Sequence, residues 1–303
     1  MKFPGWANDN LASCAYMATA MFGYVVNDAL VRQVGQTVPI GQIILIRNTL
    51  LVVLLALIVH QRGLWYQIKH IAERRVALRS FFELFATLTF LYALMRVPFA
   101  NTAAILQCLP LAVALGAVFF FRERVGVWRW SAIVIGFIGV LIIVRPGMSG
   151  FTPASLWLLV TVAFAAGRDL LARTFPDSLA TSIVALSTAC IIAIAGAVMV
   201  FLQDAWVPIS WINILRLVTA ALFLTTAYLC IVQTMRVGEI SVSVFFRYTS
   251  LLWAIFFGWL LFDELPDALT LTGSALVISM GALTLYRESY LRRRATENAT
   301  HTH

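Results

Sequence analysis

Ionisable side chains inside long apolar runs are the first candidates for chemistry in this 303-residue sequence. A charge among lipid tails costs at least about 2.5 kcal/mol on membrane-insertion scales, so it must face a partner, a watery cavity or the interface. Glu83, Arg47 and Arg247 lie about two turns inside their runs, which favours them as binding-site residues. The full set is Asp28, Arg47, Glu83, Arg168, Asp169, Arg216 and Arg247.

Arg247 has no acidic neighbour within its own apolar run. Its planar guanidinium could hold a carboxylate or a phosphate through two parallel hydrogen bonds. The alternative is a structural ion pair with Glu83 or another carboxylate. Gln107 lies 140 residues earlier and is also polar within an apolar run. A position that is polar at both places suits a cavity wall, so we predict that Arg247 and Gln107 bind substrate.

Acidic residues supply the candidates for coupling and gating. Glu83 could exchange a proton or a substrate cation, or it could be paired permanently with an arginine. Asp28 and Asp169 are 141 residues apart and suit either a pair of gates or two solvated helix ends. We predict gating or coupling roles for both, together with Arg168 and Arg47, although Arg47 also suits a helix-packing pair.

Aromatic residues near these charges could stack on an amphiphilic substrate, although each could equally be packing or an interfacial anchor. The candidates are Tyr228, Phe246, Tyr248 and Trp253. The histidines and cysteines have no metal-ligand spacing, and no phosphate-binding glycine loop occurs in the sequence. We therefore expect no cofactor and no metal.

Composition indicates the elements that must position these residues. The chain is 61% hydrophobic and 12% charged, with a mean hydropathy of +0.89. Such a chain is typical of a polytopic membrane protein. The net charge of +8 could suggest nucleic acid, but Lys and Arg gather between apolar runs without interleaved stacking aromatics. We expect the lipid bilayer as a partner and no nucleic acid.

Ten apolar runs of roughly spanning length predict an all-α fold. They are Leu11–Val31, Gly41–His60, Val76–Leu94, Phe99–Phe121, Val127–Val144, Ala154–Leu171, Thr181–Leu202, Trp211–Met235, Ile240–Phe262 and Ala268–Tyr286. Most Lys and Arg residues, with Arg79 counted among them, fall on one side if the N-terminus is inside. Positive loops stay in the cytoplasm, so both termini are predicted to be cytoplasmic, in a bacterial-type inner membrane.

Short motifs recur about 140 residues apart. Asn27–Arg32 matches Arg168–Arg173, Met95–Val97 matches Met235–Val237, and Phe121–Glu123 matches Phe262–Glu264. We predict two five-helix repeats, residues 1–145 and 146–290, followed by a polar cytoplasmic tail, residues 291–303. An odd number of helices inverts the second repeat, an arrangement that many secondary transporters use around a central cavity.

These residues resemble the EamA-type, ten-helix members of the drug/metabolite transporter superfamily. The pattern is Gln107–Pro110 to Phe121–Glu123 and then Gly136 and Gly139, repeated as Arg247–Ser250 to Phe262–Glu264 and then Gly273 and Gly281. The resemblance covers the whole chain and implies a basket of helices around a central cavity. Ser250 stands near where the first unit has Pro110, so a proline-dependent kink should be asymmetric.

The function that follows is a secondary transporter that moves small organic metabolites, resembling amino acids, nucleosides or vitamins, across the inner membrane by alternating access. A coupling proton and a monomer or homodimer are both compatible with the sequence. Two alternatives stay open: a membrane enzyme that acts on lipid-linked substrates, and a non-transporting assembly component. We favour a protein that is not an enzyme, because no nucleophile, metal site or acid/base pair stands out near an interface.

Overall fold

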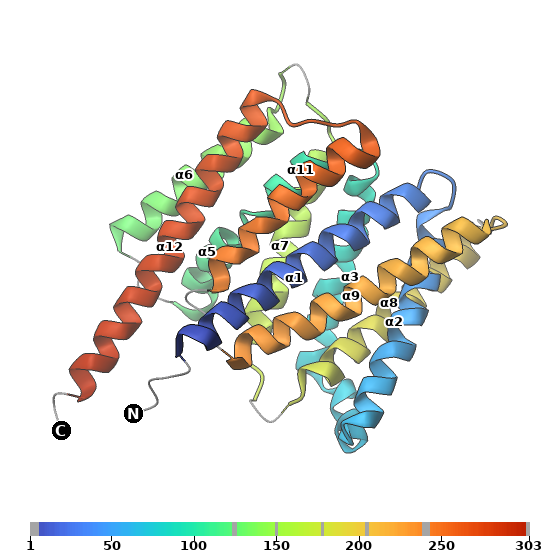
Figure 1. The fold of residues 1–303 in the computed structure, drawn as a ribbon, viewed down its shortest axis with the longest axis horizontal. Helices are drawn as coiled ribbons and strands as arrows, with labels where there is room; N and C mark the ends of the chain where they lie inside the picture. Colours follow the sequence, from blue (N-terminus) through green and yellow to red (C-terminus); the bar gives the residue numbers. More distant parts are fainter. Residues whose placement is uncertain are drawn as a thin grey trace.

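The computed structural model describes residues 6–122, 126–148, 151–176, 179–203, 206–237 and 243–300, and within these ranges it is entirely helical (Figure 1). The elements are α1 (Trp6–Val34), α2 (Ile40–Gln61), the 3-10 helix η1 (Leu64–Ala72), α3 (Arg74–Leu94), α4 (Phe99–Leu106), α5 (Leu109–Phe121), α6 (Val127–Val144), α7 (Ser155–Ala172), α8 (Thr181–Gln203), α9 (Trp211–Val237), the 3-10 helix η2 (Val244–Tyr248), α11 (Thr249–Phe262) and α12 (Ala268–Thr300).

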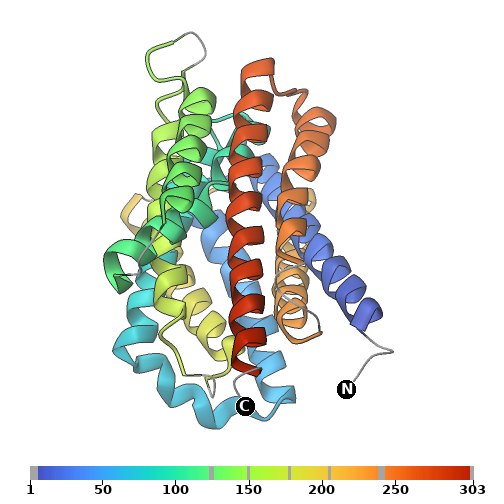
Figure 2. The ribbon, with the colours of Figure 1, turned by 90° about the vertical axis from the view of Figure 1, so that its left-hand side faces the viewer.

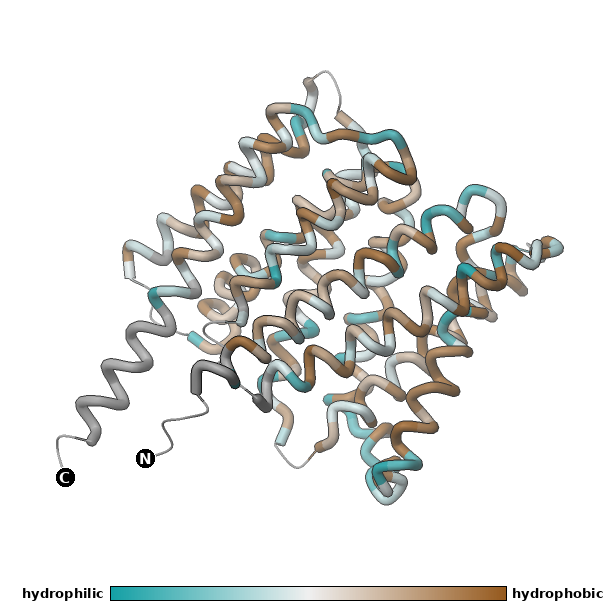
Figure 3. The backbone as a smooth tube through the Cα atoms, viewed as in Figure 1, coloured by the Kyte–Doolittle hydropathy of each residue, from teal (hydrophilic) through white to brown (hydrophobic). Residues whose placement is uncertain are grey.

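Apolar length confirms a polytopic membrane fold. Eight segments of the described residues are long and apolar enough to cross a bilayer, and each lies on a predicted run. Two shorter apolar helices, Trp130–Val144 and Ala268–Thr284, lie where the other two spans are predicted. Hydrophobic residues accordingly run along the helices and hydrophilic residues gather at several of their ends (Figure 3). The count of ten crossings stays a prediction.

The fourth predicted run is not one continuous helix. α4 ends at Leu106 and α5 begins at Leu109, with Gln107 and Cys108 bonded to carbonyls three residues back. The cause lies in Pro110, which has no N–H to offer to the carbonyl four residues earlier. The run therefore breaks near its middle.

The ninth predicted run also departs from a simple α-helix. Its first residues, 240–242, lie outside the described part of the chain, and the helix enters α11 through η2. The hydroxyl of Thr249 donates to the carbonyl of Phe246 at 2.6 Å, and that of Ser250 to the carbonyl of Arg247 at 3.0 Å. Such side-chain bonds compete with the regular helical ladder. The expected asymmetry is therefore one of chemistry: a proline interrupts one helix, and hydroxyl groups accompany the irregular start of the other.

Two stretches have helical structure on which the sequence analysis made no prediction. Residues 291–300 of the expected polar tail continue α12, and their three Arg and two Ala residues favour helix. The loop after α2 contains η1. Glu123, the last residue of one predicted motif, lies outside the described residues.

The helices pack in pairs across the molecule. α6 and α12 form one edge, α2 and α8 form the other, and α1 with α9 and α3 with α7 lie between them (Figure 1). Gly139 and Gly273 let the α6–α12 pair approach closely, since a Cβ on Gly273 would fall 2.7 Å from the Gly139 carbonyl oxygen. The start of α1 and the end of α12 lie at the same end of the bundle (Figure 2). We call the opposite end the distal end.

Candidate functional site

Charged and phenolic side chains from five elements lie within electrostatic reach of one another in the bundle. We call the set the central charge cluster; it comprises Tyr24 and Asp28 of α1, Arg47 of α2, Arg79 and Glu83 of α3, Arg168 and Asp169 of α7, and Arg247 of η2. Tyr24 is its common neighbour, because its hydroxyl senses charges of α3, α7, η2 and its own helix. The structure therefore brings together predicted residues that are far apart in sequence.

Arg168 bridges two carboxylates. Its Nη1 donates to both carboxylate oxygens of Glu83, at 2.9 and 2.8 Å, and its Nε donates to Asp169 Oδ1 at 2.8 Å. Arg79 Nη2 lies 3.8 Å from Glu83 Oε2, and its Nη1 donates to the Thr188 hydroxyl at 3.1 Å. The side chains of Arg168 and Glu83 are each 21% exposed, so the pair is largely withdrawn from solvent. Glu83 is thus paired with Arg168, the kind of arginine partner that the sequence left open.

Asp28 and Arg47 make a looser pair on α1 and α2. Asn27 Nδ2 donates to Asp28 Oδ1 at 2.9 Å, as Arg168 does to Asp169 at the matching position of α7. Arg47 is 6% exposed and interacts electrostatically with Asp28, but its Nε has no hydrogen-bond partner among the described residues. A buried guanidinium with an open donor is costly, and it marks this part of the bundle as strained or functional.

Arg247 differs from Arg79 and Arg168, whose guanidinium groups form ion pairs with carboxylates. It is half-buried, lies in η2 just before α11, and its guanidinium has no hydrogen bond or ion pair with any described residue. Arg47 also lacks both, but Asp28 lies within its electrostatic reach. The carboxylate of Asp169 and the hydroxyl of Tyr24 lie within the electrostatic reach of the Arg247 guanidinium. A cation in this position is free to receive a group from outside the chain.

Gln107 lies at the joint between the two irregular helices. It is 4% exposed, and its Nε2 donates to the Ser250 hydroxyl at 2.9 Å and to the Tyr248 carbonyl at 3.5 Å. The break after α4 thereby meets the junction of η2 and α11. Gln107 therefore contacts the segment that contains Arg247, the residue 140 positions later in the sequence. Its amide nitrogen already donates to Tyr248 and Ser250.

The predicted aromatic residues do not all lie in one place. Trp253 packs edge-on against Phe22, with ring centroids 4.9 Å apart, and Phe246 is 38% exposed. Tyr248 is buried, and a side chain at Gly281 of α12 would collide with its hydroxyl. Tyr228 and Tyr248 are the two that reach the cluster, Tyr228 toward Arg79 and Tyr24 and Tyr248 toward Arg247. Both hydroxyls are buried and without a hydrogen-bond partner among the described residues.

Sequence reasoning missed Tyr24 and the contacts of Arg79. Tyr24 precedes Asp28 by four residues, and Arg79 precedes Glu83 by four, so each pair shares a helix face. That spacing was the available signal. Arg79 was counted only as a topology-setting charge, but its side chain is 19% exposed and bonds to Thr188 and Glu83.

An ion pair between Arg32 and Glu264 lies at the distal end of the bundle, and we call it the Arg32–Glu264 clamp. Arg32 Nη1 and Nη2 donate to Glu264 Oε2 and Oε1 at 2.8 and 2.7 Å. Glu264 Oε2 also accepts the backbone N–H of Phe99 at 2.7 Å, which caps the start of α4. The guanidinium of Arg32 lies 4.5 Å from the ring centre of Phe262. The clamp therefore joins α1, α4 and the end of α11.

Another ion pair at the distal end joins α6 to α12. Arg145 Nη2 donates to Asp267 Oδ1, and Asp267 also accepts the backbone N–H of Thr270 at 2.9 Å. These hydrogen bonds, chiefly the one from Arg145, hold the pKa of the Asp267 carboxyl well below its usual range.

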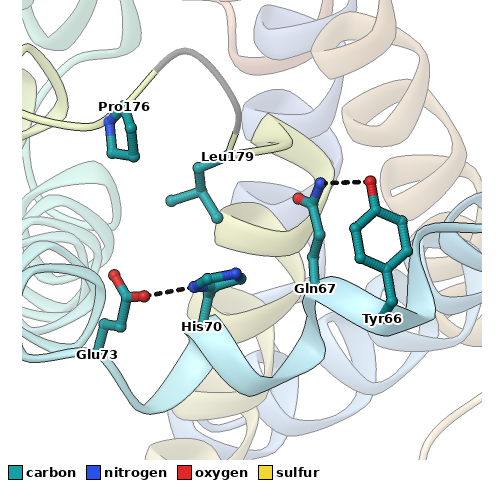
Figure 4. A pocket seen from close by; sticks show the side chains of 6 residues that line it. All are labelled: Tyr66, Gln67, His70, Glu73, Pro176 and Leu179. Atoms are coloured by element: carbon teal, nitrogen blue, oxygen red, sulfur yellow. Dashed lines mark hydrogen bonds and ion pairs between the residues drawn. The ribbon is translucent and has the colours of Figure 1, made fainter.

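A pocket of about 250 Å³ lies outside the cluster, lined by Tyr66, Gln67, His70, Glu73, Pro176 and Leu179 (Figure 4). His70 Nδ1 contacts Glu73, and Gln67 Oε1 accepts the backbone N–H of Ala180 at 2.9 Å, which holds η1 against the start of α8. None of the cluster residues lines this pocket. Within the described part of the chain, no group of His, Cys, Asp and Glu side chains could hold a metal ion.

The fold and the site together define a class: a multi-pass helical membrane protein with an unpaired cation among buried ion pairs. Residues 11–145 match the EamA-like transporter family. Together with the relatives described next, this match confirms the predicted resemblance to EamA-type transporters of the drug/metabolite transporter superfamily.

The relatives are transporters and not enzymes. The chain is 25% identical to the pseudopaline exporter of Pseudomonas aeruginosa over 268 residues, which cover 86% of this chain and 90% of the exporter. It is 28% identical to the riboflavin transporter of Vibrio cholerae, over 72% of this chain and 73% of that protein. It is 22% identical to an S-adenosylmethionine uptake transporter of Rickettsia conorii, over 73% and 74% of the two chains. These findings support a transporter of small molecules in a membrane.

A solved crystal structure has the same fold. It superposes with a TM-score of 0.62 at 15% sequence identity, and the match covers 90% of this chain and 96% of the other.

Proposed function

We propose that this protein is a secondary transporter that moves small organic metabolites across a bacterial-type inner membrane by alternating access. The observation that carries the proposal is Arg247, a cation without a hydrogen bond or ion pair among the described residues, in the electrostatic neighbourhood of the ion pairs of α3 and α7. A protein gains nothing in stability from such a residue, so binding is the simplest reason for its presence. The relatives carry chemically different metabolites and include both exporters and uptake systems, which leaves substrate and direction to experiment.

Helix pairing supports two inverted repeats, residues 1–145 and 146–290. In the two repeats, α1, α2, α3, α5 and α6 are equivalent to α7, α8, α9, α11 and α12. Each packed pair therefore has an equivalent packed pair: α1–α9 corresponds to α3–α7, α1–α11 to α5–α7, and α2–α9 to α3–α8. The α2–α8 and α6–α12 pairs correspond to themselves. Arg122 and Asp263, 141 residues apart, both end their helices in the left-handed conformation, with φ of 53° and 54°. Such an arrangement suits a site at the repeat interface.

Roles for individual residues follow from their contacts. We propose Arg247 as the substrate contact, with Gln107, Tyr248, Phe246, Trp253 and Tyr228 as the surrounding candidates. Glu83 could bind substrate or a coupling proton only if its ion pair with Arg168 broke. Asp28 with Arg47, and Asp169 with Arg168, occupy matching positions on α1 and α7 and are proposed as gating or coupling pairs. The Arg32–Glu264 clamp would then close the periplasmic side, and both termini would be cytoplasmic.

Uptake into proteoliposomes tests the proposal. Vesicles that contain the purified protein are incubated with a bacterial metabolite extract, and their contents are compared by mass spectrometry with those of protein-free vesicles. We expect at least one small metabolite to enter only with the protein, and a pH gradient across the vesicle membrane to change its rate if a proton is coupled. Vesicles that gain no metabolite in either orientation of the gradient would favour the non-transporting alternative.

A further inference from the structure

The charge balance of the central charge cluster changes once its contacts are known. The sequence sets three acidic residues against three arginines, Arg47, Arg168 and Arg247, with no preference for substrate charge. The structure adds Arg79, whose guanidinium lies 3.8 Å from Glu83. The cluster therefore has one more arginine than it has carboxylates.

The surplus charge can be assigned to one residue. Glu83 is held by Arg168 and Arg79, and Asp169 is held by Arg168. Asp28 has Asn27 and the field of Arg47. These contacts engage the three carboxylates with arginines other than Arg247. Arg247 is left with no hydrogen bond or ion pair among the described residues.

We infer that the transported metabolite carries an oxyanion, a carboxylate or a phosphate, that docks on Arg247; this rests on the proposed function. A guanidinium presents parallel N–H donors that match two oxygens of either group. A bound anion would bring the formal charge of the cluster to neutrality. Tyr24 and Asp169, which share the electrostatic neighbourhood of Arg247, would lie beside the bound group.

A neutral or purely cationic substrate fits this arrangement poorly. It would leave Arg247 uncompensated inside the bundle, at the cost that membrane insertion assigns to an unpaired charge. A cationic substrate would also have to displace Arg168 or Arg79 from carboxylates that they already hold. The oxyanion can be part of a zwitterion, because the inference concerns only the group that reaches Arg247.

Affinity selection from a metabolite mixture tests the inference without a known substrate. Purified wild-type protein and Arg247→Gln are incubated with a bacterial metabolite extract, and the retained compounds are identified by mass spectrometry. We expect every compound retained by wild type and lost by Arg247→Gln to carry a carboxylate or a phosphate. Measured on one such compound, Arg247→Gln should weaken binding by roughly tenfold to a hundredfold.

Two comparisons make the result specific. Arg96→Gln removes an equal charge from an exposed arginine that contacts only its own helix, through Tyr92, and it should retain the wild-type set. Arg247→Lys keeps the charge without the fork and should lie between wild type and Arg247→Gln. Melting curves should show all three variants folded. Binding is then measured for analogues of each retained compound, one with its carboxylate converted to an amide and one with its phosphate removed. The change that abolishes binding identifies which of the two oxyanions contacts Arg247.

The outcomes separate this inference from the transport proposal. It is overturned if wild type retains no compound, if the compounds lost by Arg247→Gln lack an oxyanion, or if Arg247→Gln retains the wild-type set. If a neutral metabolite enters proteoliposomes with the protein, transport stands and the inference is wrong. If oxyanions bind through Arg247 but none enters the vesicles, binding stands and transport is wrong.

Discussion

Breaking the Arg32–Glu264 clamp should cost a measurable part of the stability of the bundle. We propose a double-mutant cycle of Arg32→Ala, Glu264→Ala and both together. The carboxylate accepts three hydrogen bonds of 2.7 to 2.8 Å, two of them from the guanidinium. The two side chains are 12% and 29% exposed, so water screens the pair only in part.

The expected magnitude follows from these contacts. Hydrogen bonds to charged groups contribute about 1.5–3 kcal/mol, and loss of one partner of a buried pair costs about 3–5 kcal/mol. Partial exposure puts the clamp near the lower end, so we expect a coupling energy of about 2 kcal/mol between Arg32 and Glu264. At about 2–4 °C for each kcal/mol in proteins of somewhat smaller size, the clamp accounts for a melting-temperature change of roughly 4–8 °C.

Thermal unfolding of the purified variants in one detergent measures the cycle. Arg96→Ala is the matched control: its guanidinium lies over Tyr92, donates to the carbonyl of that same residue and joins no second helix. We expect it to melt within about 1 °C of wild type, as an exposed surface change should. A coupling energy below about 0.5 kcal/mol would refute the idea that the pair holds α1 to α11.

Three further predictions concern single residues. Arg247→Ala should leave the melting temperature within about 2 °C of wild type, whereas Arg168→Ala removes the arginine partner of Asp169, leaves Glu83 with Arg79 alone, and should lower the unfolding free energy by about 3 kcal/mol; equal losses would mean that Arg247 has a structural partner. Gly273→Ala should cost about 1–3 kcal/mol in thermal melts because it forces α6 and α12 apart, while Gly126→Ala, with no atom near its Cβ, should be neutral. The depressed pKa of Asp267 gives stability that is present above about pH 4 and is lost gradually as pH falls further. Wild type should therefore melt above Asp267→Asn at about pH 6, and the difference should be smaller at about pH 2; an equal difference at both pH values would contradict this.

Hydrophobic runs predicted the spanning segments because apolar length is a local property of the sequence. The eight long spans lie on predicted runs, and the match of residues 11–145 to the EamA-like transporter family agrees with the predicted resemblance. What local reasoning missed was the interior of a run. Pro110 stops α4 from continuing into α5, and the hydroxyls of Thr249 and Ser250 bond to carbonyls where η2 gives way to α11.

The candidate site could be predicted as a set of residues but not as a set of partners. Buried charge alone selected Glu83, Arg168 and Arg247, since an ionisable group in an apolar run is rare. Which arginine meets Glu83 depends on how α3 packs on α7, and that contact has no local signal. Arg79 shows the same limit: the sequence identified it only as a positive charge, and its hydrogen bond to Thr188 of α8 depends on how α3 packs on α8.

The joint at Gln107 and Ser250 has a mechanical consequence. A continuous helix resists bending, whereas one that is interrupted within the bilayer behaves as two stiff levers with a pivot between them. Here two such helices share one pivot, because the Gln107 amide nitrogen bonds to the Ser250 hydroxyl at 2.9 Å. The segments on either side of this joint could then change their angles separately, while the hydrogen bond between Gln107 and Ser250 keeps the two helices in register where they cross.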